Sequence, residues 1–391
     1  MADVTVAHYD LNTRGGGEAV CMNVLDALQD EHALSLLTAA DVTDWDGLND
    51  YFGTDVREIP IRTLRIGGLD FAAVVEEAER IGYFTSLFQH TVFNRYCRRA
   101  GSEADLLVST WNELSVDADS VQYIHFPRLY REMNPTEGYE DRWAARTVVN
   151  AARAVARRIA GYDEAAVRQA TLLANSAWTA GHVEECYGTS PAVLNPPIDT
   201  TGLSPSPPWE EREDGFVFLS RIAPEKNVPW LIEILRKVRE RGHDVHFHVI
   251  GPKDSGAPEH FAAVQSLARE HDFVTLEGPM YGEALHGMLR RHRYGINGAR
   301  SEQFGIAIAE MVAAGMIPFV PNSGGQREIV NENPAVMFDT TAEAAEKIAT
   351  VVSDRQRAER IRADFPDIEA KYGTEVFGER IRTVVDERLE R

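Results

Sequence analysis

Short apolar runs alternate with longer amphipathic stretches along nearly the whole chain, and this alternation constrains the fold more than any other feature. In the first half the runs occupy residues 4–10, 33–39, 104–110, 121–126, 171–176 and 192–197. In the second half they occupy residues 215–220, 245–251, 273–278, 294–298 and 317–321. Runs of this length predict buried strands, and the helical patterns between them predict parallel pairing. We therefore expect an α/β fold with two Rossmann-like, doubly wound domains.

A segment rich in proline, serine and acids, residues 197–214, separates the two series of strands. Its composition is typical of a linker between domains. We expect an N-terminal domain over residues 1–205 and a C-terminal domain over residues 206–371. The last stretch, residues 372–391, is one more charged amphipathic helix, which we expect to pack back toward the N-terminal domain.

The chain is strongly acidic, with 61 acidic residues against 40 Lys and Arg and a formal charge of -21 at pH 7. This balance argues against a nucleic-acid-binding protein, which needs clustered cations. Lysine is confined to positions 226, 237, 253, 347 and 371. Abundant acids with scarce Lys predict a halophilic, salt-rich cytoplasm, where screening reduces self-repulsion. A GC-rich genome would also explain the Lys deficit, though not the acid excess.

Cysteine spacing and hydropathy bear on the compartment. Cys21, Cys97 and Cys186 are not spaced as metal ligands, which indicates a reducing compartment without a disulfide framework. No basic and apolar leader precedes the first strand, and no apolar run approaches ~20 residues. We expect a cytoplasmic protein, with peripheral contact to the inner face of the membrane as a further expectation.

The stretch SEQFGIAIAEMVAAG, residues 301–315, carries two carboxylates, Glu302 and Glu310, around the expected start of a helix. A helix that begins near Phe304 leaves three amides free to hold an anion, those of Gln303, Phe304 and Gly305. Glu310 would lie roughly 7–9 Å along the axis at ~1.5 Å per residue, a reach that suits a ribose. Glu302 would face the group that is attached to the phosphate farther from the ribose. The alternative is an ordinary amphipathic helix with two solvated glutamates.

The loop RIAPEKNVPW follows the first strand of the second series and carries Arg221 and Lys226. Two cations at the carboxyl end of a strand can clamp a diphosphate, and Asn227 can help to begin the next helix. A basic surface loop is the alternative. That alternative weakens because this loop and the helix start near Phe304 open on the same sheet edge.

The first half offers a glycine turn and a histidine at the corresponding edge. Gly15, Gly16 and Gly17 permit close backbone approach to a ligand, although the dinucleotide fingerprint fails because Val20 stands where the third glycine belongs. His125 ends the apolar run 121–126, where parallel sheets bind ligands. A tight structural turn and a histidine satisfied by the core remain alternatives.

Two further features of the first half are weaker. The Asp-x-Asp of Asp117 and Asp119 resembles a metal-binding signature, but it lies in a polar turn of an acid-rich chain, and we discount it. Residues 80–102 and the helical stretch after Asp141 carry arginines without any acid among them. These patches predict contact with an anionic membrane or a lipid phosphate, unless their arginines pair with acids elsewhere.

Several ordered motifs together resemble glycosyltransferase family 4, whose members are retaining enzymes of the GT-B fold, with two Rossmann-like domains facing across a cleft. In the second half these motifs are RIAPEK, SEQFGIAIAEMVAAG and NSGGQREIV. In the first half they are RGGGEAV, YIHFP, ANSAWTAGHVEECYG and VLNPPID, which are most similar to the α-1,2-mannosyltransferases of dolichol-linked glycan assembly and their archaeal and bacterial relatives. Residues 40–81 match nothing in that pattern, and we expect no N-terminal membrane anchor of the eukaryotic type.

The resemblance implies roles for these residues. Arg221 and Lys226 would neutralise the leaving nucleoside diphosphate in place of a metal ion, so that neither metal nor cofactor is expected. Glu310 would hold the ribose, Glu302 the donor sugar, and His125 would face the sugar from the first domain. The catalytic set is His125, Arg221, Lys226 and Glu302. The donor-binding set is Gly16, Gly17, Arg221, Lys226, Gln303, Phe304, Gly305, Ile306 and Glu310.

By the same resemblance, the expected reaction moves a hexose, with mannose preferred, from a GDP- or UDP-linked donor to a glycan or polyprenyl-linked acceptor. Another GT-B enzyme, either a sugar-phosphate synthase or an epimerase, is one alternative. A non-catalytic GT-B scaffold subunit is another, and the intact charged residues argue against it. A Rossmann dehydrogenase comes third because the fingerprint fails.

Overall fold

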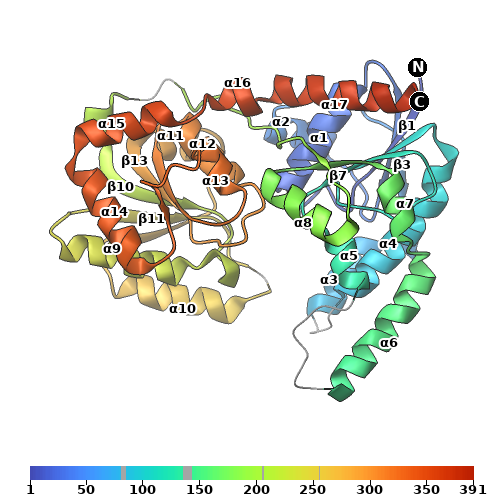
Figure 1. Ribbon diagram of the computed structural model, residues 1–391, viewed down its shortest axis with the longest axis horizontal. Coiled ribbons are helices and arrows are strands. Elements are labelled where there is room, and N and C mark those ends of the chain that lie inside the picture. Colours follow the sequence, from blue (N-terminus) through green and yellow to red (C-terminus); the bar gives the residue numbers. More distant parts are fainter. Residues whose placement is uncertain (81–84, 135–142, 205–206, 255) are drawn as a thin grey trace. The chain divides into compact units, whose positions relative to one another are not determined.

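The computed structural model describes residues 1–80, 85–134, 143–204, 207–254 and 256–391, and it divides the chain into two compact α/β units (Figure 1). The first unit comprises Met1–Pro197 together with Thr374–Arg391, and the second comprises Ile198–Gly373. The boundary expected at residue 205 thus falls inside the second unit.

The first unit is built on a seven-stranded sheet with the order β3-β2-β1-β6-β7-β8-β9, in which every pairing is parallel. Its strands are β1 (Asp3–Ala7), β2 (Ala33–Thr38), β3 (Ile61–Thr63), β6 (Leu106–Ser109), β7 (Ser120–Ile124), β8 (Thr171–Ala174) and β9 (Ala192–Val193). A small antiparallel hairpin joins β4 (Arg65–Ile66) to β5 (Leu69–Asp70). The strand order reverses between β1 and β6, so ligands are expected at the carboxyl ends of those two strands.

Helices cover both faces of this sheet because the strand side chains alternate between the faces. They are α1 (Gly16–Leu28), α2 (Trp45–Phe52), α3 (Phe71–Arg80), α4 (Ser86–Ala100), α5 (Arg128–Met133), α6 (Trp143–Ala160), α7 (Glu164–Gln169), α8 (Ala177–Tyr187) and the C-terminal α17 (Thr374–Leu389). Val4 and Val6 share a core with α1 and with Phe377 and Ile381 of α17. Figure 1 shows α17 (red) beside α1 (blue), so the chain end completes the first unit.

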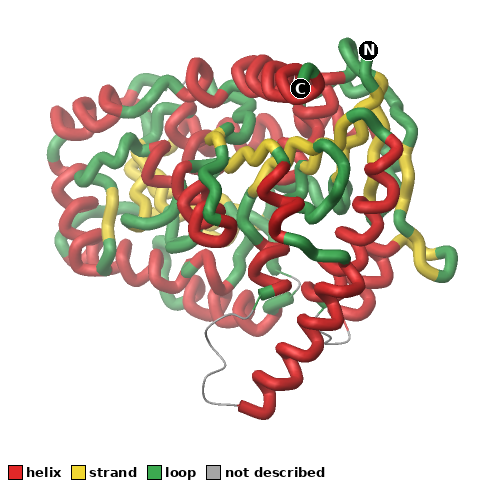
Figure 2. Tube along the Cα trace, turned by 45° about the vertical axis from the view of Figure 1, so that its right-hand side comes forward, coloured by secondary structure: helices red, strands yellow, loops and turns green. Residues whose placement is uncertain are grey.

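The second unit contains a six-stranded parallel sheet with the order β12-β11-β10-β13-β14-β15. The strands are β10 (Glu213–Leu219), β11 (His246–Ile250), β12 (Val274–Gly278), β13 (His292–Ile296), β14 (Ile317–Pro321) and β15 (Met337–Phe338). The helices are α9 (Val228–Glu240), α10 (Pro258–Arg269), α11 (Gly282–Arg291), α12 (Ile306–Ala313), α13 (Gln326–Ile329), α14 (Thr341–Ser353), α15 (Arg355–Asp364) and α16 (Ile368–Tyr372). Figure 2 shows the strands in yellow among the red helices.

The expectation of a linker over residues 197–214 is wrong for most of that segment. Ile198 and Leu203 belong to the core of the second unit, and the Ile198 amide donates to the Tyr372 carbonyl at 2.8 Å. Trp209 is buried beneath the guanidinium groups of three arginines, Arg212, Arg293 and Arg362. Cation–π contacts and burial of the indole therefore fix a segment whose proline and acid content suggested a flexible connection.

Candidate functional site

The second sheet reverses its strand order at β10, which pairs with β11 on one side and with β13 on the other. Loops leave the carboxyl ends of β10, β13 and β14 on the same edge, at residues 220–227, 297–305 and 322–325. A reversal point of this kind is where open parallel sheets bind their ligands. The predicted residues of the second half all lie on these loops or on α12.

Arg221 lies two residues beyond β10 and is 56% exposed. Its guanidinium contacts Asp254 Oδ2 at 3.0 Å and Glu225 Oε1 at 3.4 Å. These acids hold the side chain at the loop, while its exposed part can still meet an anion. An arginine in this position suits a phosphate because its planar fork can donate two parallel hydrogen bonds.

A short 3-10 turn, Pro224–Lys226, directs Lys226 toward the loop that follows β13. Lys226 Nζ donates to Glu302 Oε2 at 2.7 Å, and both side chains are largely buried. The structure thus brings together a cation and a carboxylate that the sequence places in separate motifs. Asn227 occupies the N-cap of α9, but its side chain donates to the Gly298 carbonyl at 2.9 Å instead of capping the helix.

Helix α12 begins at Ile306, two residues later than expected, with Gly305 as its N-cap at φ +105°. Only glycine adopts that backbone conformation without strain. The Ile308 and Ala309 amides donate to the Gly305 carbonyl, so the amides without an intrahelical acceptor are those of Ile306 and Ala307. The helix therefore presents the Ile306 and Ala307 amides at its start, and anion binding by the Gln303, Phe304 and Gly305 amides stays a prediction. Phe304 is buried against Tyr372 and serves the core.

Glu310 lies one turn into α12, about 6 Å from Ile306 at ~1.5 Å per residue, closer than the sequence suggested. Burial, with a smaller contribution from the charge of Asp199, raises the pKa of Glu310 to about 7. Among the described residues no hydrogen bond or ion pair reaches its carboxyl group. A carboxyl group held without a partner beside an anion-binding helix end suits the hydroxyls of a ligand.

Three residues that support these loops were not singled out from the sequence. Gln326 is fully buried, accepts from Asn297 Nδ2 at 2.8 Å and donates to the Ala299 carbonyl at 2.8 Å. Gly324 has φ +80°, and a Cβ there would lie 2.4 Å from the Glu302 carbonyl oxygen. Glycines directly after strands were the available signal, since close approach of backbones requires them.

In the first unit, the predicted Gly16 and Gly17 form the start of α1, with Gly15 as its N-cap. The Gly15 amide donates to Glu18 Oε2 at 2.6 Å, and Glu18 Oε1 lies 3.4 Å from Nε2 of the buried His8. Burial opposes charge on both groups, but their contact outweighs it and lowers the pKa of Glu18 to about 2. The sequence did not point to His8 or Glu18, and their contacts hold the glycine turn in place.

His125 follows β7, and its ring lies beneath Gly17, whose Cβ would be 3.6 Å from His125 Nε2. Nε2 donates to the Thr110 carbonyl at 3.0 Å, which fixes the tautomer. Burial lowers the pKa of His125 to about 4, so the ring is neutral at pH 7. The structure therefore joins His125, Gly16 and Gly17 at one sheet edge in the first unit, while the other predicted residues meet in the second unit.

The Asp-x-Asp motif is engaged in ion pairs. Asp117 accepts from Arg98 at 2.7 Å, and Asp119 accepts from Arg388 of α17 at 2.7 Å. The first patch of arginines is also partly engaged, since Arg95 donates to the Ile159 carbonyl at 3.0 Å. Residues 81–84 of the first patch and Arg142 of the second lie outside the described residues. No helix among the described residues is long and apolar enough to cross a membrane.

Solved structures resemble the chain over nearly its whole length. The Anabaena protein HepE, solved with UDP and glucose, superposes with a TM-score of 0.67 at 14% identity and covers 99% of this chain and 100% of its own. A sucrose-phosphate synthase from Thermosynechococcus elongatus superposes with a TM-score of 0.67 at 14% identity and covers 99% of each chain. Two Rossmann-like units on parallel sheets, together with this likeness, identify the GT-B class of fold.

Residues 200–364, most of the second unit, match the family described as "Glycosyl transferases group 1". The chain is also similar to two proteins named GDP-Man:Man(3)GlcNAc(2)-PP-Dol alpha-1,2-mannosyltransferase. The Dictyostelium discoideum protein is 24% identical over 206 residues, 48% of this chain and 41% of that protein. The Neurospora crassa protein is 25% identical over 281 residues, 61% of this chain and 50% of that protein. The matches therefore span half or less of these relatives.

Proposed function

We propose that the protein is a retaining glycosyltransferase that moves a hexose, with mannose as first choice, from a nucleoside-diphosphate sugar to a glycan or polyprenyl-linked glycan. The observation that carries this proposal is the common sheet edge of the second unit. There, Arg221 and Lys226 lie with the free amides of α12, and Glu302 and Glu310 lie with them.

The charges on this edge match the parts of such a donor. The diphosphate binds the Ile306 and Ala307 amides, with Arg221 and Lys226 as counter-charges that stabilise the leaving group. Glu310 accepts from the ribose hydroxyls and Glu302 from the sugar hydroxyls. In the first unit, His125 is the proposed sugar-contacting residue, and Gly16 and Gly17 leave backbone room for a phosphate at the carboxyl edge of that unit's own sheet. In this proposal Arg221 and Lys226 take the place of a metal ion, so transfer should persist in EDTA.

Mannose and a lipid-linked acceptor are proposed from the relatives, whose name specifies GDP-mannose and a dolichol diphosphate glycan. Contact with an anionic membrane is supported by α6, which exposes Val155 and Ile159 at 58% and 45% on an arginine-bearing helix. Liposome flotation tests it: we expect retention on anionic vesicles, and equal retention on neutral vesicles would contradict the electrostatic part.

The donor is identified by thermal unfolding with GDP-mannose, UDP-glucose, GDP and UDP, each in high and low KCl. A bound donor stabilises the folded state by mass action, so GDP-mannose should raise the midpoint most. A larger shift with UDP-sugars would replace mannose by another hexose. Added KCl alone should raise the midpoint if the acidic surface is an adaptation to salt.

Two alternatives within the fold remain distinguishable by products. Incubation with donor alone should yield at most slow hydrolysis, whereas an epimerase would convert the sugar. A sugar-phosphate synthase would need a phosphorylated sugar as acceptor, and one solved structure similar to this chain is such an enzyme. Transfer to a polyprenyl-linked glycan, but not to a sugar phosphate, is the result that supports the proposal.

A further inference from the structure

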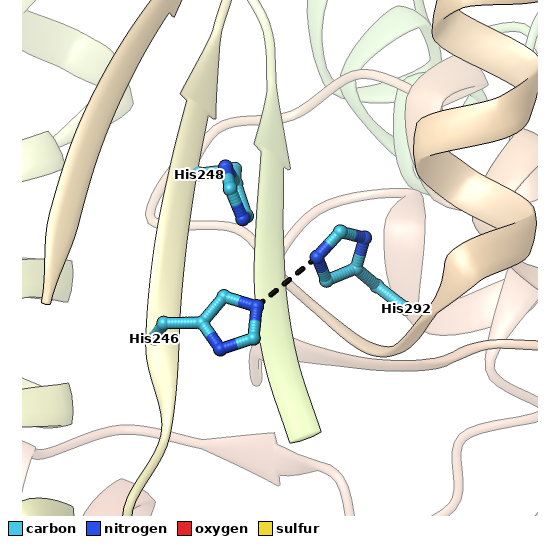
Figure 3. A group of neighbouring side chains, drawn as sticks. All are labelled: His246, His248 and His292. Atoms are coloured by element: carbon cyan, nitrogen blue, oxygen red, sulfur yellow. Dashed lines mark hydrogen bonds between the residues drawn. The ribbon is translucent and has the colours of Figure 1, made fainter. Parts of the chain in front are cut away.

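Three histidines lie close together at the amino ends of the strands of the second sheet (Figure 3). The loops 220–227, 297–305 and 322–325 lie at the opposite, carboxyl ends. His246 opens β11, His248 lies two residues further on the same face, and His292 opens β13. Their ring centroids are 4.7–5.2 Å apart, so the rings form a nearly equilateral triangle. Each ring offers a nitrogen, and these nitrogens lie within 4.8 Å of one another. None of the three takes part in the proposed transfer.

The strand between them leaves the space that the rings occupy. β10 runs between β11 and β13, and its Gly215 is paired with His246. A Cβ on Gly215 would lie 2.2 Å from His246 Nε2 and 2.5 Å from His292 Cδ2. Any side chain at this central strand position would therefore separate the two rings. Glycine in a strand interior usually weakens a sheet, but here Gly215 leaves room for the rings of His246 and His292.

A carboxylate from β10 completes the group. Glu213 Oε2 lies 3.4 Å from His246 Nε2 and 3.7 Å from His292 Nε2, and the two ring nitrogens are 3.1 Å apart. A tetrahedral Zn²⁺ with bonds of about 2.0–2.1 Å separates its ligand atoms by roughly 3.3 Å. The three observed separations bracket that value. The other oxygen of Glu213 accepts from Arg291 Nε at 2.9 Å, which holds the carboxylate in place.

The outer hydrogen bonds leave ring lone pairs for a ligand. His292 Nδ1 lies 2.7 Å from the Met288 carbonyl, which can only accept, so the proton is on Nδ1 and Nε2 carries the lone pair. That lone pair accepts a hydrogen bond from His246 Nε2 at 3.1 Å, the dashed line of Figure 3, and a metal ion would displace the proton between the two nitrogens. His248 Nδ1 lies 2.6 Å from Glu277 Oε1, which leaves Nε2 of that ring available. Metal-binding histidines characteristically donate their second N–H to a carbonyl or a carboxylate in this way.

We propose that His246, His248, His292 and Glu213 form a binding site for one transition-metal ion, with Zn²⁺ as the first choice. Three imidazoles and one carboxylate are a ligand set that suits Zn²⁺. The ion would cross-link β11 and β13 over β10 at the amino ends of these strands. Because the cations and carboxylates of the proposed donor site lie at the carboxyl ends, the metal stabilises the second unit and does not take part in the transfer.

The test uses the full-length protein without a histidine tag, stripped with EDTA and dialysed into metal-free buffer. Calorimetric titration with Zn²⁺ should saturate at one ion per chain, and Zn²⁺ should raise the thermal midpoint by mass action. Co²⁺ should give the intense visible absorption of a tetrahedral site. Affinity should fall as the pH drops below the range where histidine is neutral, because protons compete for the ring nitrogens.

Four variants locate the ion. His246→Gln and His248→Gln should lower the Zn²⁺ affinity by about 100-fold or more, and Glu277→Gln, which loses only an outer hydrogen bond, by about tenfold. Gly215→Ala keeps every ligand but fills the space between the rings, so it should also abolish binding. His182→Gln in α8 of the first unit is the matched control and should bind Zn²⁺ as the unmodified protein does.

Two results would overturn the site. One is a thermal midpoint of the unmodified protein that does not respond to Zn²⁺. The other is equal Zn²⁺ affinity in His246→Gln, His248→Gln and the unmodified protein. The midpoint of each variant without metal shows whether it folds, and Gly215→Ala gives an answer even if a histidine variant is unstable. Turnover at fixed temperature should be the same with and without Zn²⁺, which separates this site from the proposed reaction.

Discussion

Lys226 Nζ and Glu302 Oε2 form an ion pair of 2.7 Å across two loops that follow different strands. The Lys226 and Glu302 side chains are 18% and 15% exposed, so both charges are largely shielded from water. A buried pair of this kind loses most when one partner is removed, because the remaining charge is left uncompensated. In the proposed donor complex, a phosphate that binds Lys226 would share it with Glu302, and this sharing would couple the proposed sugar and phosphate contacts.

Removal of the Lys226 charge should lower transfer by about 10²-fold or more, since a lost stabiliser of developing charge costs several kcal/mol. The measurement is release of the nucleoside diphosphate from Lys226→Ala under saturating donor. Lys237→Ala in α9, which removes a partly exposed lysine of the same unit, should leave turnover within twofold, a bound set by the small effect of surface charges. Near-normal turnover of Lys226→Ala would remove the clamp from the mechanism.

Glu310→Ala should raise the donor KM by about 10-fold, with kcat little changed, because ribose contacts act in the ground state and transition state alike. With its pKa raised to about 7, Glu310 ionises as the pH rises from 6 to 8. Donor affinity should therefore increase over that interval and stay flat in Glu310→Gln, as measured by calorimetry at each pH. A loss confined to kcat would contradict the ribose assignment.

Gly324→Ala should both destabilise the protein and slow transfer. The φ of +80° costs a non-glycine residue about 1–2 kcal/mol, and the new Cβ would press on the Glu302 carbonyl at 2.4 Å. Gly287→Ala in α11, which meets no atom within 4 Å, is the control and should raise stability by about 0.4–1 kcal/mol. Thermal midpoints and turnover of the two variants give the comparison. Equal behaviour would show that the turn does not hold Glu302.

Glu113→Gln should alter the pH dependence of stability. Glu113 is buried, accepts from the Tyr130 amide and the Tyr187 hydroxyl, and its Oε2 has no partner among the described residues. Burial raises the pKa of Glu113 to about 7, above its value in the unfolded chain. Its favourable contribution is thus complete below pH ~4.3 and is lost as the pH rises through 7, by up to about 3 kcal/mol.

The thermal midpoint of the unmodified protein should therefore fall relative to that of Glu113→Gln between pH 5 and pH 8.5. Glu387→Gln on the exposed side of α17 should track the unmodified protein at every pH. Parallel curves for all three proteins would show that Glu113 does not titrate in this range.

The local hydrophobic pattern of the sequence was enough to predict most strands of the two large sheets. The runs at 33–39 and 317–321 became β2 and β14 because apolar strands buried on both faces leave a strong signal. β3 and β15 were missed, since three and two residues at a sheet edge carry little hydrophobic pattern. The linker was misjudged because Trp209 is fixed by Arg293 and Arg362, which are distant in sequence and cannot be seen from local composition.

The candidate site shows the same limit. Charges at strand ends located Arg221, Lys226 and Glu302, because the parallel topology alone places such loops on one edge. The start of α12 was set two residues too early, since φ +105° at Gly305 ends the loop there, and backbone angles cannot be read from residue types. The support from Asn297 and Gln326 depends on pairing across 29 residues of chain.

The division of the first unit between both ends of the chain has a consequence for synthesis. Val4, Val6 and α1 are synthesised before the second unit, but Phe377, Ile381 and Val385, which complete their core, are synthesised after it. The second unit, by contrast, is contiguous and closes its own ends through the contact of Ile198 with Tyr372. During synthesis the second unit should therefore be able to fold before the first unit is complete. Truncation of the last 18 residues should expose the flank of α1 while leaving the second unit folded.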